Sequence, residues 1–151
     1  MIPVLALLSF AAQAEVKVEM KAEKVNIQQG KEVLSPANQA APGEILQYTA
    51  TYKNVDKAPA TKVDATLKIP AGTEYIPGTA TPAGAWASTD GTTFSPIPLK
   101  HMVKNSQGKM VEQEVAFSEY RALRWSLGDL AGGASRTVSA RVKLSTGPAA
   151  H

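Results

Sequence analysis

The sequence predicts an all-β sandwich, and three observations lead to this prediction. Apolar and polar residues alternate with a period of two in several short runs, as they do in half-buried strands. Segments rich in Pro, Gly, Asn and Asp separate those runs, with a turn about every 8 to 12 residues. No stretch has the apolar spacing of a convincing amphipathic helix. The pattern therefore favours an immunoglobulin-like antiparallel β-sandwich of about seven strands with a hairpin insertion.

Residues 1–14 are interpreted as a secretory signal peptide that precedes the fold. Residues 2–12 form an uncharged apolar run, and the Ala-Gln-Ala that ends at Ala14 has the form of a cleavage site. The run is too short for a membrane-spanning helix, which needs about 20 apolar residues. The alternative is that the run is a buried first strand or helix. We expect the sandwich to occupy residues 15–145 and residues 146–151 to form a flexible tail.

The first predicted strand covers residues 15–27. Its apolar residues occupy even positions as far as Ala22 and odd positions from Val25 onward. A slip of one residue turns every later side chain to the other face of a sheet, so we expect a bulge or a change of sheet near Glu23 and Lys24. Residues 28–43 are expected to form a long connection without a strand.

Two clean alternating runs follow this connection. Residues 44–54 and 61–69 each place apolar side chains on one face and polar side chains on the other. Pro70 ends the second run, because proline has no N–H to donate to a strand ladder. The side chains expected to point inward are Leu46, Tyr48, Ala50, Tyr52, Val63, Ala65, Leu67 and Ile69.

The middle of the chain is less regular. After a short strand within residues 73–80, residues 86–94 are predicted to form a hairpin around Asp90 and Gly91, since Asp-Gly favours tight primed turns. Residues 95–118 contain two prolines near their start and a polar turn further on. We expect this segment to be a hairpin insertion rather than a helix.

The last strand pair, residues 123–144, closes the sandwich. Two alternating runs flank a Gly-Asp-Leu-Ala-Gly-Gly turn, which is typical of a hairpin or of a corner between sheets. Trp125 is expected to lie between the two sheets. The side chains that the final run should bury are Val138, Ala140, Val142 and Leu144.

Four motifs occur in a fixed order along residues 41–144. Residues 41–54 carry Pro-Gly before a Tyr-containing strand that ends in Asn, and residues 58–63 follow as Ala-Pro-Ala-Thr-Lys-Val. Residues 69–79 begin with Ile-Pro-Ala-Gly, and residues 125–133 read Trp-Ser-Leu-Gly-Asp-Leu-Ala-Gly-Gly. In these motifs the chain resembles the bacterial domain-of-unknown-function-eleven family of immunoglobulin-like surface and envelope modules. The resemblance implies an extracytoplasmic location and a structural or adhesive role, but no particular activity.

The composition argues against several classes of function. The formal net charge of +3 is small, and Lys and Arg alternate with Asp and Glu, so we expect no nucleic-acid binding. The chain has no cysteine, and His101 is the one histidine inside the predicted domain, so we expect neither a transition-metal site nor acid–base catalysis. No segment after residue 14 is apolar enough to cross a membrane. We therefore predict a protein that is not an enzyme and that has no cofactor.

Calcium is the remaining metal to consider, since oxygen ligands in sandwich loops suit it. Asn54, Asp56, Asp90 and Asp129 all fall in predicted turns. Asn and Asp are common in turns for their own backbone hydrogen bonds, however, and the chain has no Asp-x-Asp-x-Asp run. The prediction is therefore that no metal is bound.

Two groups of residues are the candidates for a binding site. Trp86 and Phe94 flank the predicted hairpin, where an exposed aromatic ring marks a contact surface. Val16, Val18 and Met20 form the apolar face of the first strand, which a long connection separates from the rest of the domain. Such a strand can add to a neighbouring subunit through main-chain hydrogen bonds. Alternatively, it is the first strand of its own sandwich.

The sequence thus predicts a secreted, periplasmic or cell-surface bacterial protein. We expect a non-enzymatic structural or interaction module of the envelope or extracellular layer, which works through a protein partner or through self-association. The alternative is a glycan- or peptide-binding module that uses aromatic side chains at a loop end.

Overall fold

The computed structural model describes residues 14–37 and 41–145. The predicted signal peptide, apart from Ala14, and the predicted tail from residue 146 lie outside the described residues. The described chain consists of strands and turns, with one short 3-10 helix, η1 (Phe117–Glu119). The strands are β1 (Val16–Gln28), β2 (Lys31–Pro36), β3 (Ile45–Asn54), β4 (Ala60–Lys68), β5 (Thr73–Tyr75), β6 (Trp86–Ser88), β7 (Ser95–Pro96), β8 (Lys100–Lys104), β9 (Met110–Glu114), β10 (Ala122–Leu130) and β11 (Ser135–Leu144).

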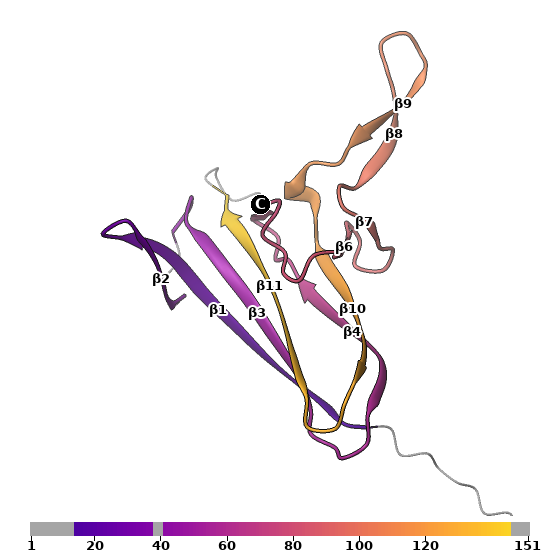
Figure 1. Ribbon diagram of the computed structural model, residues 1–151. Helices are drawn as coiled ribbons and strands as arrows, with labels where there is room; N and C mark the ends of the chain where they lie inside the picture. The colour runs from indigo at the N-terminus through magenta and orange to yellow at the C-terminus, as the bar shows by residue number, and fades with distance from the viewer. Residues whose placement is uncertain (1–13, 38–40, 146–151) are drawn as a thin grey trace, which may run out of the picture.

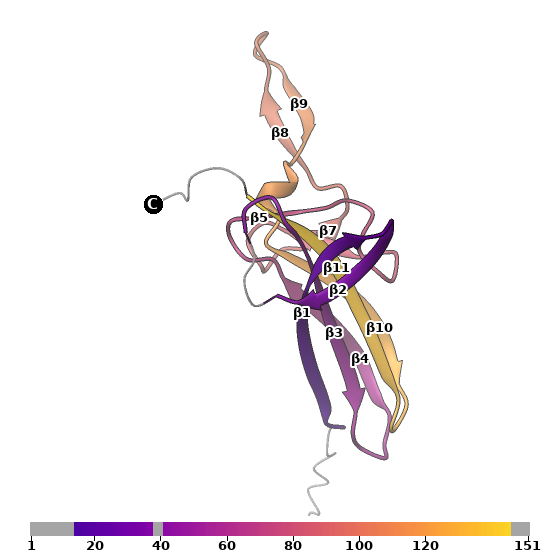
Figure 2. The same cartoon turned by 90° about the vertical axis from the view of Figure 1, so that its left-hand side faces the viewer.

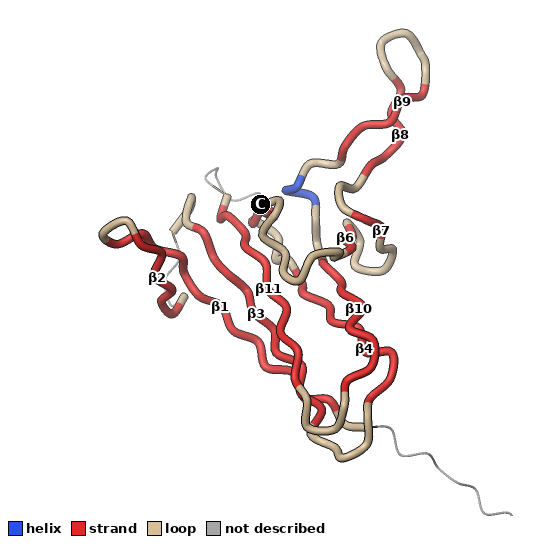
Figure 3. The backbone as a smooth tube through the Cα atoms, viewed as in Figure 1, coloured by secondary structure: helices blue, strands red, loops and turns tan. Residues whose placement is uncertain are grey.

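The strands form two antiparallel sheets packed together and one separate hairpin (Figures 1 and 3). Sheet A has the strand order β2-β1-β3-β11-β5, and sheet B has the order β4-β10-β6-β7. Strands β8 and β9 pair with each other and project from one end of the sandwich (Figure 2). The predicted immunoglobulin-like antiparallel β-sandwich with a hairpin insertion is therefore confirmed.

The described chain has eleven strands, and the prediction of about seven was too low. One reason is that β2 lies in a segment that was expected to be a connection. The other reason is that the hairpins β6–β7 and β8–β9 each contribute two short strands. Strands β10 and β11 lie in different sheets, so their connection is a corner and not a hairpin.

One hydrophobic cluster fills the space between the sheets. Strands β3, β5 and β11 contribute to it from sheet A, and β4, β6 and β10 contribute from sheet B. Among the described residues of β1, Val16 alone packs against this cluster. Sheet A is therefore wider than the core that sheet B covers. Of the side chains that were predicted to point inward, those that are buried are Leu46, Ala50, Tyr52, Ala65, Leu67, Ile69, Val138, Ala140 and Val142, whereas Tyr48, Val63 and Leu144 are half-buried.

Aromatic side chains fix the core at two places. Trp125 is 2% exposed, and its indole nitrogen donates a hydrogen bond to the carbonyl oxygen of Pro82 at 2.7 Å, so its predicted position between the sheets is confirmed. The ring of Tyr120 stacks on that of Tyr75, with 5.6 Å between the ring centroids. Burial raises the pKa of the Tyr120 hydroxyl, which accepts a hydrogen bond from the N–H of Leu99 at 2.8 Å. Tyr120 thereby anchors the segment that leads into the β8–β9 hairpin.

At the other end of the sandwich, the side chain of Asn54 joins two connections between the sheets. Its amide nitrogen donates hydrogen bonds to the carbonyl oxygens of Ala58 at 2.8 Å and Leu130 at 2.9 Å. Its amide oxygen accepts a hydrogen bond from the N–H of Asp56 at 3.0 Å. Asn54 is 0% exposed, so its side-chain amide makes these hydrogen bonds with the protein in place of hydrogen bonds with water. The β3–β4 connection is thus tied to the β10–β11 corner.

The main chains of the same two connections also meet closely. The N–H of Asn54 donates a hydrogen bond to the carbonyl oxygen of Ala134 at 2.9 Å. A Cβ atom at Gly132 would collide with the backbone carbonyl of Lys57, which leaves glycine as the residue that this approach tolerates. The glycines of this corner therefore serve packing as well as the turn.

The segment from residue 28 to residue 43, which was predicted to be a connection without a strand, contains β2. That prediction is wrong. Gln28 pairs with Lys31, and the two residues between them have positive φ angles, 51° for Gln29 and 76° for Gly30. A two-residue turn with both φ angles positive is typical of a β-hairpin. Gln-Gly stands here where Asn-Gly or Asp-Gly is more common, and for this reason the hairpin was missed.

Neither a bulge nor a change of sheet, the two alternatives expected near Glu23 and Lys24, occurs in β1. Strand β1 pairs with β3 in one continuous register, from Val16 opposite Asn54 to Val25 opposite Ile45. The change of parity is accommodated differently. Lys24 lies opposite Leu46, on the inner face of sheet A, and forms an ion pair with Glu44 at 2.7 Å. Because the ion pair accommodates the charge on this face, no bulge is needed to turn Lys24 outward.

The loop between β6 and β7 also differs from the prediction of a tight turn at Asp90 and Gly91. Trp86 pairs with Pro96, and Ala87 pairs with Ser95, so residues 89–94 form a longer loop. Asp90 is not part of a two-residue primed turn. Its carboxylate accepts hydrogen bonds from the backbone N–H groups of Thr92 and Thr93 within this longer loop.

We expect Asn54→Ala to lower the free energy of unfolding by about 3 kcal/mol, because it leaves two carbonyl groups and one N–H without partners in a buried junction. Urea denaturation measures this change. Asn105→Ala is the matched control, since Asn105 accepts hydrogen bonds from Gln107 and Lys109 in the exposed turn of the β8–β9 hairpin. The control should cost less than about 1 kcal/mol. Equal losses in the two variants would show that the junction is not a special point of stability.

Candidate functional site

The predicted binding residues lie on two separate surfaces. Val16, Val18 and Met20 belong to β1, near the margin of sheet A, and Trp86 belongs to β6 in sheet B. Phe94 lies in the loop before β7. The structure does not bring the two groups together, so each surface is described by itself.

The first surface is the edge of β1 that faces away from β3. Strand β1 pairs with β3 over residues 16–25, whereas β2 covers its other edge over residues 23–28. Strand β2 ends at Pro36, opposite Glu23. Residues 16–22 therefore have no strand beside them on that side within the described chain, and we call this stretch the open edge.

The direction of the backbone groups at the open edge follows from the pairing with β3. The carbonyl oxygen of Glu15 accepts a hydrogen bond from the N–H of Val55 at 3.0 Å, so the main-chain groups of Glu15 point toward β3. Backbone groups of successive residues in a strand point to opposite sides. The N–H and C=O groups of Val16, Val18 and Met20 therefore point outward, where they are available to another strand.

Two of these residues, Val18 and Met20, have side chains that are unusually exposed for their position. Val18 lies opposite Tyr52, and Met20 lies opposite Ala50, so both share the core-facing side of sheet A. Tyr52 and Ala50 are 8% and 0% exposed, but Val18 and Met20 are 46% and 56% exposed. The difference arises because sheet B does not extend over β1. Apolar side chains and free main-chain groups therefore occur together along one edge.

The opposite face of β1 is charged in an alternating pattern. Glu15, Lys17, Glu19, Lys21 and Glu23 follow one another at every second position. Lys21 and Glu23 form an ion pair at 3.5 Å. Positive charge on an edge strand commonly discourages pairing with other chains. Here each lysine has a glutamate two residues away, so the edge has little net charge to repel another strand.

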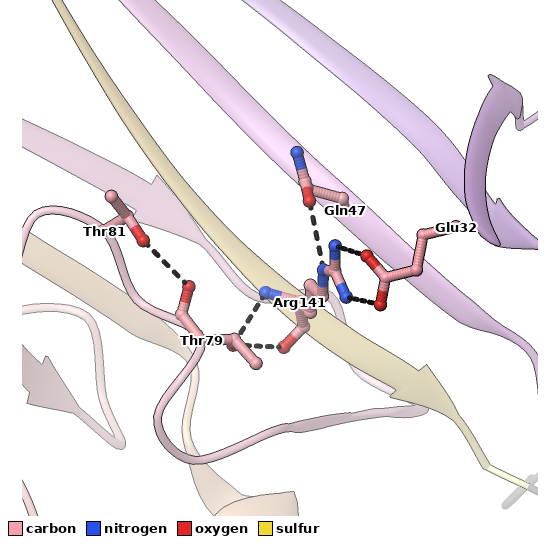
Figure 4. A network of polar contacts seen from close by, with 5 residues as sticks. All are labelled: Glu32, Gln47, Thr79, Thr81 and Arg141. Atoms are coloured by element: carbon pink, nitrogen blue, oxygen red, sulfur yellow. Dashed lines mark hydrogen bonds and ion pairs between the residues drawn. The ribbon is translucent and has the colours of Figure 1, made fainter.

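An ion pair between β2 and β11 holds the β1–β2 hairpin against the sheet (Figure 4). The Arg141 guanidinium donates hydrogen bonds to both carboxylate oxygens of Glu32, at 3.0 and 2.9 Å, and to the side-chain oxygen of Gln47 at 3.0 Å. The hydrogen bonds from Arg141 lower the pKa of the Glu32 carboxyl. The hydroxyl of Thr79 accepts a hydrogen bond from the N–H of Arg141 at 3.0 Å. This network fixes the turn end of the hairpin and leaves residues 16–22 uncovered.

The second surface surrounds Trp86 on the outer face of sheet B. Trp86 is 49% exposed and lies opposite Arg124 of β10 on one side and Pro96 of β7 on the other. Residues opposite one another share a face of the sheet. The guanidinium carbon of Arg124 lies 3.8 Å from the centre of the Phe94 ring, which is a cation–π contact. Trp86 and Phe94 are thus neighbours of the same arginine.

Arg124 has an unsatisfied donor. Its Nε atom is buried and has no hydrogen-bond partner within the described part of the chain. Arg124, Gly84, Trp86 and Ser126 line a pocket of 280 Å³. Trp86 also lines a second pocket of 360 Å³, together with Tyr75 and Ile97.

The loop that contains Phe94 is organised by Asp90. The Asp90 carboxylate accepts hydrogen bonds from the N–H groups of Thr92 and Thr93, each at 2.8 Å, and from the hydroxyl of Ser88 at 2.7 Å. These hydrogen bonds, of which the one from Thr93 has the largest effect, hold the pKa of the Asp90 carboxyl far below its ordinary value. The carboxylate therefore remains ionised and continues to accept these bonds at low pH.

The residues considered for a metal or for catalysis have other roles or stand apart. The side chain of Asn54 is engaged by Ala58 and Leu130, that of Asp90 is engaged within its own loop, and Asp129 accepts a hydrogen bond from the N–H of Lys62 at 3.4 Å. His101 is exposed on β8 and lines a pocket of 390 Å³ beside the Asp90 loop. Within residues 14–37 and 41–145, no three His, Cys, Asp or Glu side chains are grouped closely enough to hold a metal ion.

Comparison of the chain with protein-family models, with curated proteins and with solved structures gave no match. In the described part of the chain, no helix has the length and apolarity that crossing a membrane requires.

Two features of these surfaces were missed from the sequence. Arg124 alternates with Leu123 and Trp125, and this alternation places it on the outer face, but no sequence pattern predicts that it reaches Phe94. The sequence pattern names Val16, Val18 and Met20 as candidates, but it does not show that the edge at residues 16–22 is open, because the pattern of β1 is that of an ordinary half-buried strand. Only the extent of β2 and of sheet B determines that the inner face of β1 is uncovered.

We expect the two tryptophans of the chain to differ sharply in acrylamide quenching, because Trp86 is 49% exposed and Trp125 is 2% exposed. Trp86→Phe should leave a blue-shifted emission with a Stern–Volmer constant several times smaller than that of the parent protein. Circular dichroism of the variant serves as the control for folding. An unchanged quenching constant in folded Trp86→Phe would contradict the exposure of the indole.

Proposed function

We propose that this protein is a non-enzymatic structural or interaction module that works through protein–protein contacts, and that its open edge accepts an extended strand of a partner. The observation that carries the proposal is the coincidence, along residues 16–22, of unpaired main-chain groups with exposed apolar side chains on the inner face. Strand addition satisfies both at once, since a new strand supplies hydrogen bonds to the backbone and covers alternate side chains.

The physical reason to expect a partner is the cost of the exposed strip. Val18 and Met20 occupy positions of the core face and leave about half of their side chains in water. Burial of a Val or Met side chain is worth about 1.5 to 3 kcal/mol relative to full exposure. A partner strand recovers part of this free energy, and its side chains with inward parity extend the core past sheet B.

We place the module outside the cytoplasm of a bacterium, in the periplasm or at the cell surface. Two features of the sequence support this location. The apolar run of residues 2–12 has the character of a secretory signal, and residues 41–144 resemble the domain-of-unknown-function-eleven family of surface and envelope modules.

A nine-residue peptide with the sequence of residues 14–22 tests strand addition. Labelled with a fluorophore, it should bind the protein with a rise in anisotropy, since its alternation matches that of the open edge. N-methylation at its Val16, Val18 and Met20 removes the donors that face the protein and should weaken binding at least about tenfold. N-methylation at its Lys17 and Glu19, whose amides face away, should have a smaller effect. Equal affinity for all three peptides would contradict pairing through the main chain.

A second candidate function, the binding of a glycan, rests on the surface around Trp86. An exposed indole provides a flat apolar face for a sugar ring, and the Arg124 guanidinium beside it suits a carboxylate. The positive charge of Arg124 beside the pocket favours an acidic sugar over a neutral one, because a carboxylate can accept two parallel hydrogen bonds from a guanidinium. Trp86 lies on a strand, so this surface is not at a loop end.

Trigalacturonate, compared with the neutral trisaccharide of galactose, tests the glycan candidate. We expect Trp86 emission to change with trigalacturonate, and Arg124→Gln to weaken this binding about tenfold by removing the charged partner of the carboxylate. Arg136→Gln, which alters an exposed arginine of β11, is the matched control and should bind as the parent protein does. The absence of any response to trigalacturonate, or an equal response in the two variants, would contradict a site at Arg124.

A further inference from the structure

We infer that the partner of the open edge is the open edge of a second copy of this chain, paired antiparallel about a twofold axis at Val18. The inference rests on the proposed function, because it requires that the edge accepts a strand, and it adds the identity and the register of that strand. Three constraints select this arrangement: the faces of the two strands, their charges, and the position of β2.

The first constraint is that the apolar faces must coincide. Residues opposite one another in a sheet point to the same side, so even positions must lie opposite even positions. The outward main-chain groups of β1 also belong to its even positions, since Glu15 bonds toward β3. In every register that keeps the apolar faces together, the twofold axis therefore passes through a residue of β1 and not between two residues. From one such register to the next, the axis moves by one residue along β1.

The second constraint is charge. With the axis at Val18, Lys17 lies opposite Glu19 of the second copy, and Glu15 lies opposite Lys21. Symmetry repeats both pairs, so all four contacts join opposite charges. With the axis at Glu19, Lys17 lies opposite Lys21 and Glu19 lies opposite its own copy, which places like charges together. Opposite charges across a pair of strands stabilise it, and like charges destabilise it.

The third constraint is that β2 blocks one end of the edge. With the axis at Met20, the charges again match, since Lys17 meets Glu23 and Glu19 meets Lys21. This register, however, places Val16 of the second copy opposite Lys24, where β2 already pairs with β1. The axis at Val18 uses residues 15–21 of each copy, all of which lie before the part of β1 that β2 covers.

The selected register also matches the apolar side chains. Val18 lies opposite Val18 of the second copy, and Val16 lies opposite Met20, so the two exposed strips cover one another. Because Val16, Val18 and Met20 direct their main-chain groups outward, each of these pairs exchanges two backbone hydrogen bonds. The five-stranded sheets of the two copies become one continuous sheet through an isologous interface.

Charge-swap variants test this pairing by sedimentation equilibrium. We expect the parent protein to be a dimer in a reversible, concentration-dependent equilibrium. Lys17→Glu and Glu19→Lys each create two like-charge contacts and should weaken association about tenfold. The double variant restores opposite charges at both contacts and should return the affinity to near that of the parent. Lys17 lies opposite Lys53 of its own sheet, so Lys17→Glu does not threaten the fold of the subunit.

The double variant also identifies the register. With the axis at Met20, the double variant would have like charges at Lys17–Glu23 and Glu19–Lys21 contacts, so it would associate more weakly than either single variant. Association through any other surface, including residues 1–13, would not respond to the swap at all. A protein that is monomeric at all concentrations, or a double variant without recovery, overturns the inference.

The peptide experiment separates this inference from the proposed function. If the peptide of residues 14–22 binds through its outward amides while the full chain remains monomeric, the edge accepts a strand and the second copy is not its partner. If neither the peptide nor a second copy binds, strand addition at this edge is itself excluded. Peptide binding together with charge-swap rescue supports both.

Discussion

The side chain of Asn54 is the interaction on which the arrangement of the two sheets depends. It lies at the end of β3, the strand that pairs with both β1 and β11, and it bonds to two of the connections through which the chain passes between the sheets. Complete burial gives these hydrogen bonds no competition from water. Gly132 allows the same connections to approach within backbone contact. Sheet B is thereby fixed over β3 and β11 and not over β1.

The offset between the sheets is what creates the candidate interface. Sheet A continues past the core by the width of β1 and β2. Side chains on the core-facing side of β1, such as Val18 and Met20, are therefore exposed to water. The Glu32–Arg141 pair keeps β2 at one end of β1 and therefore keeps the other end open. Strand β1 is an edge strand with one apolar face and one face of alternating charge. The register of a partner strand is then set by charge as well as by burial of apolar side chains. Such an edge is suited to one specific neighbour and not to indiscriminate association.

The sequence was a good guide wherever one face of a strand is buried and the other is wet. Strands β3, β4 and β11 were predicted with their inward residues, and Trp125 was placed between the sheets, because a period of two directly reflects this environment. The same logic failed at β2, whose turn uses Gln29 and Gly30 in place of a more recognisable pair. It also failed at Lys24, where a bulge was expected to keep the charged side chain off the inner face. The side chain instead lies on that face and forms an ion pair with Glu44.

The sequence by itself determined the fold class, most of the strands and the candidates Val16, Val18, Met20, Trp86 and Phe94, because alternation and turn chemistry are local properties of the chain. Tertiary structure alone decided which of these residues are exposed. Val18 and Tyr52 occupy equivalent positions in the pattern of their strands, yet one is half in water and the other is buried. Exposure depends on how far the opposite sheet extends, and that extent is set by contacts between residues far apart in the chain, such as Asn54 and Leu130.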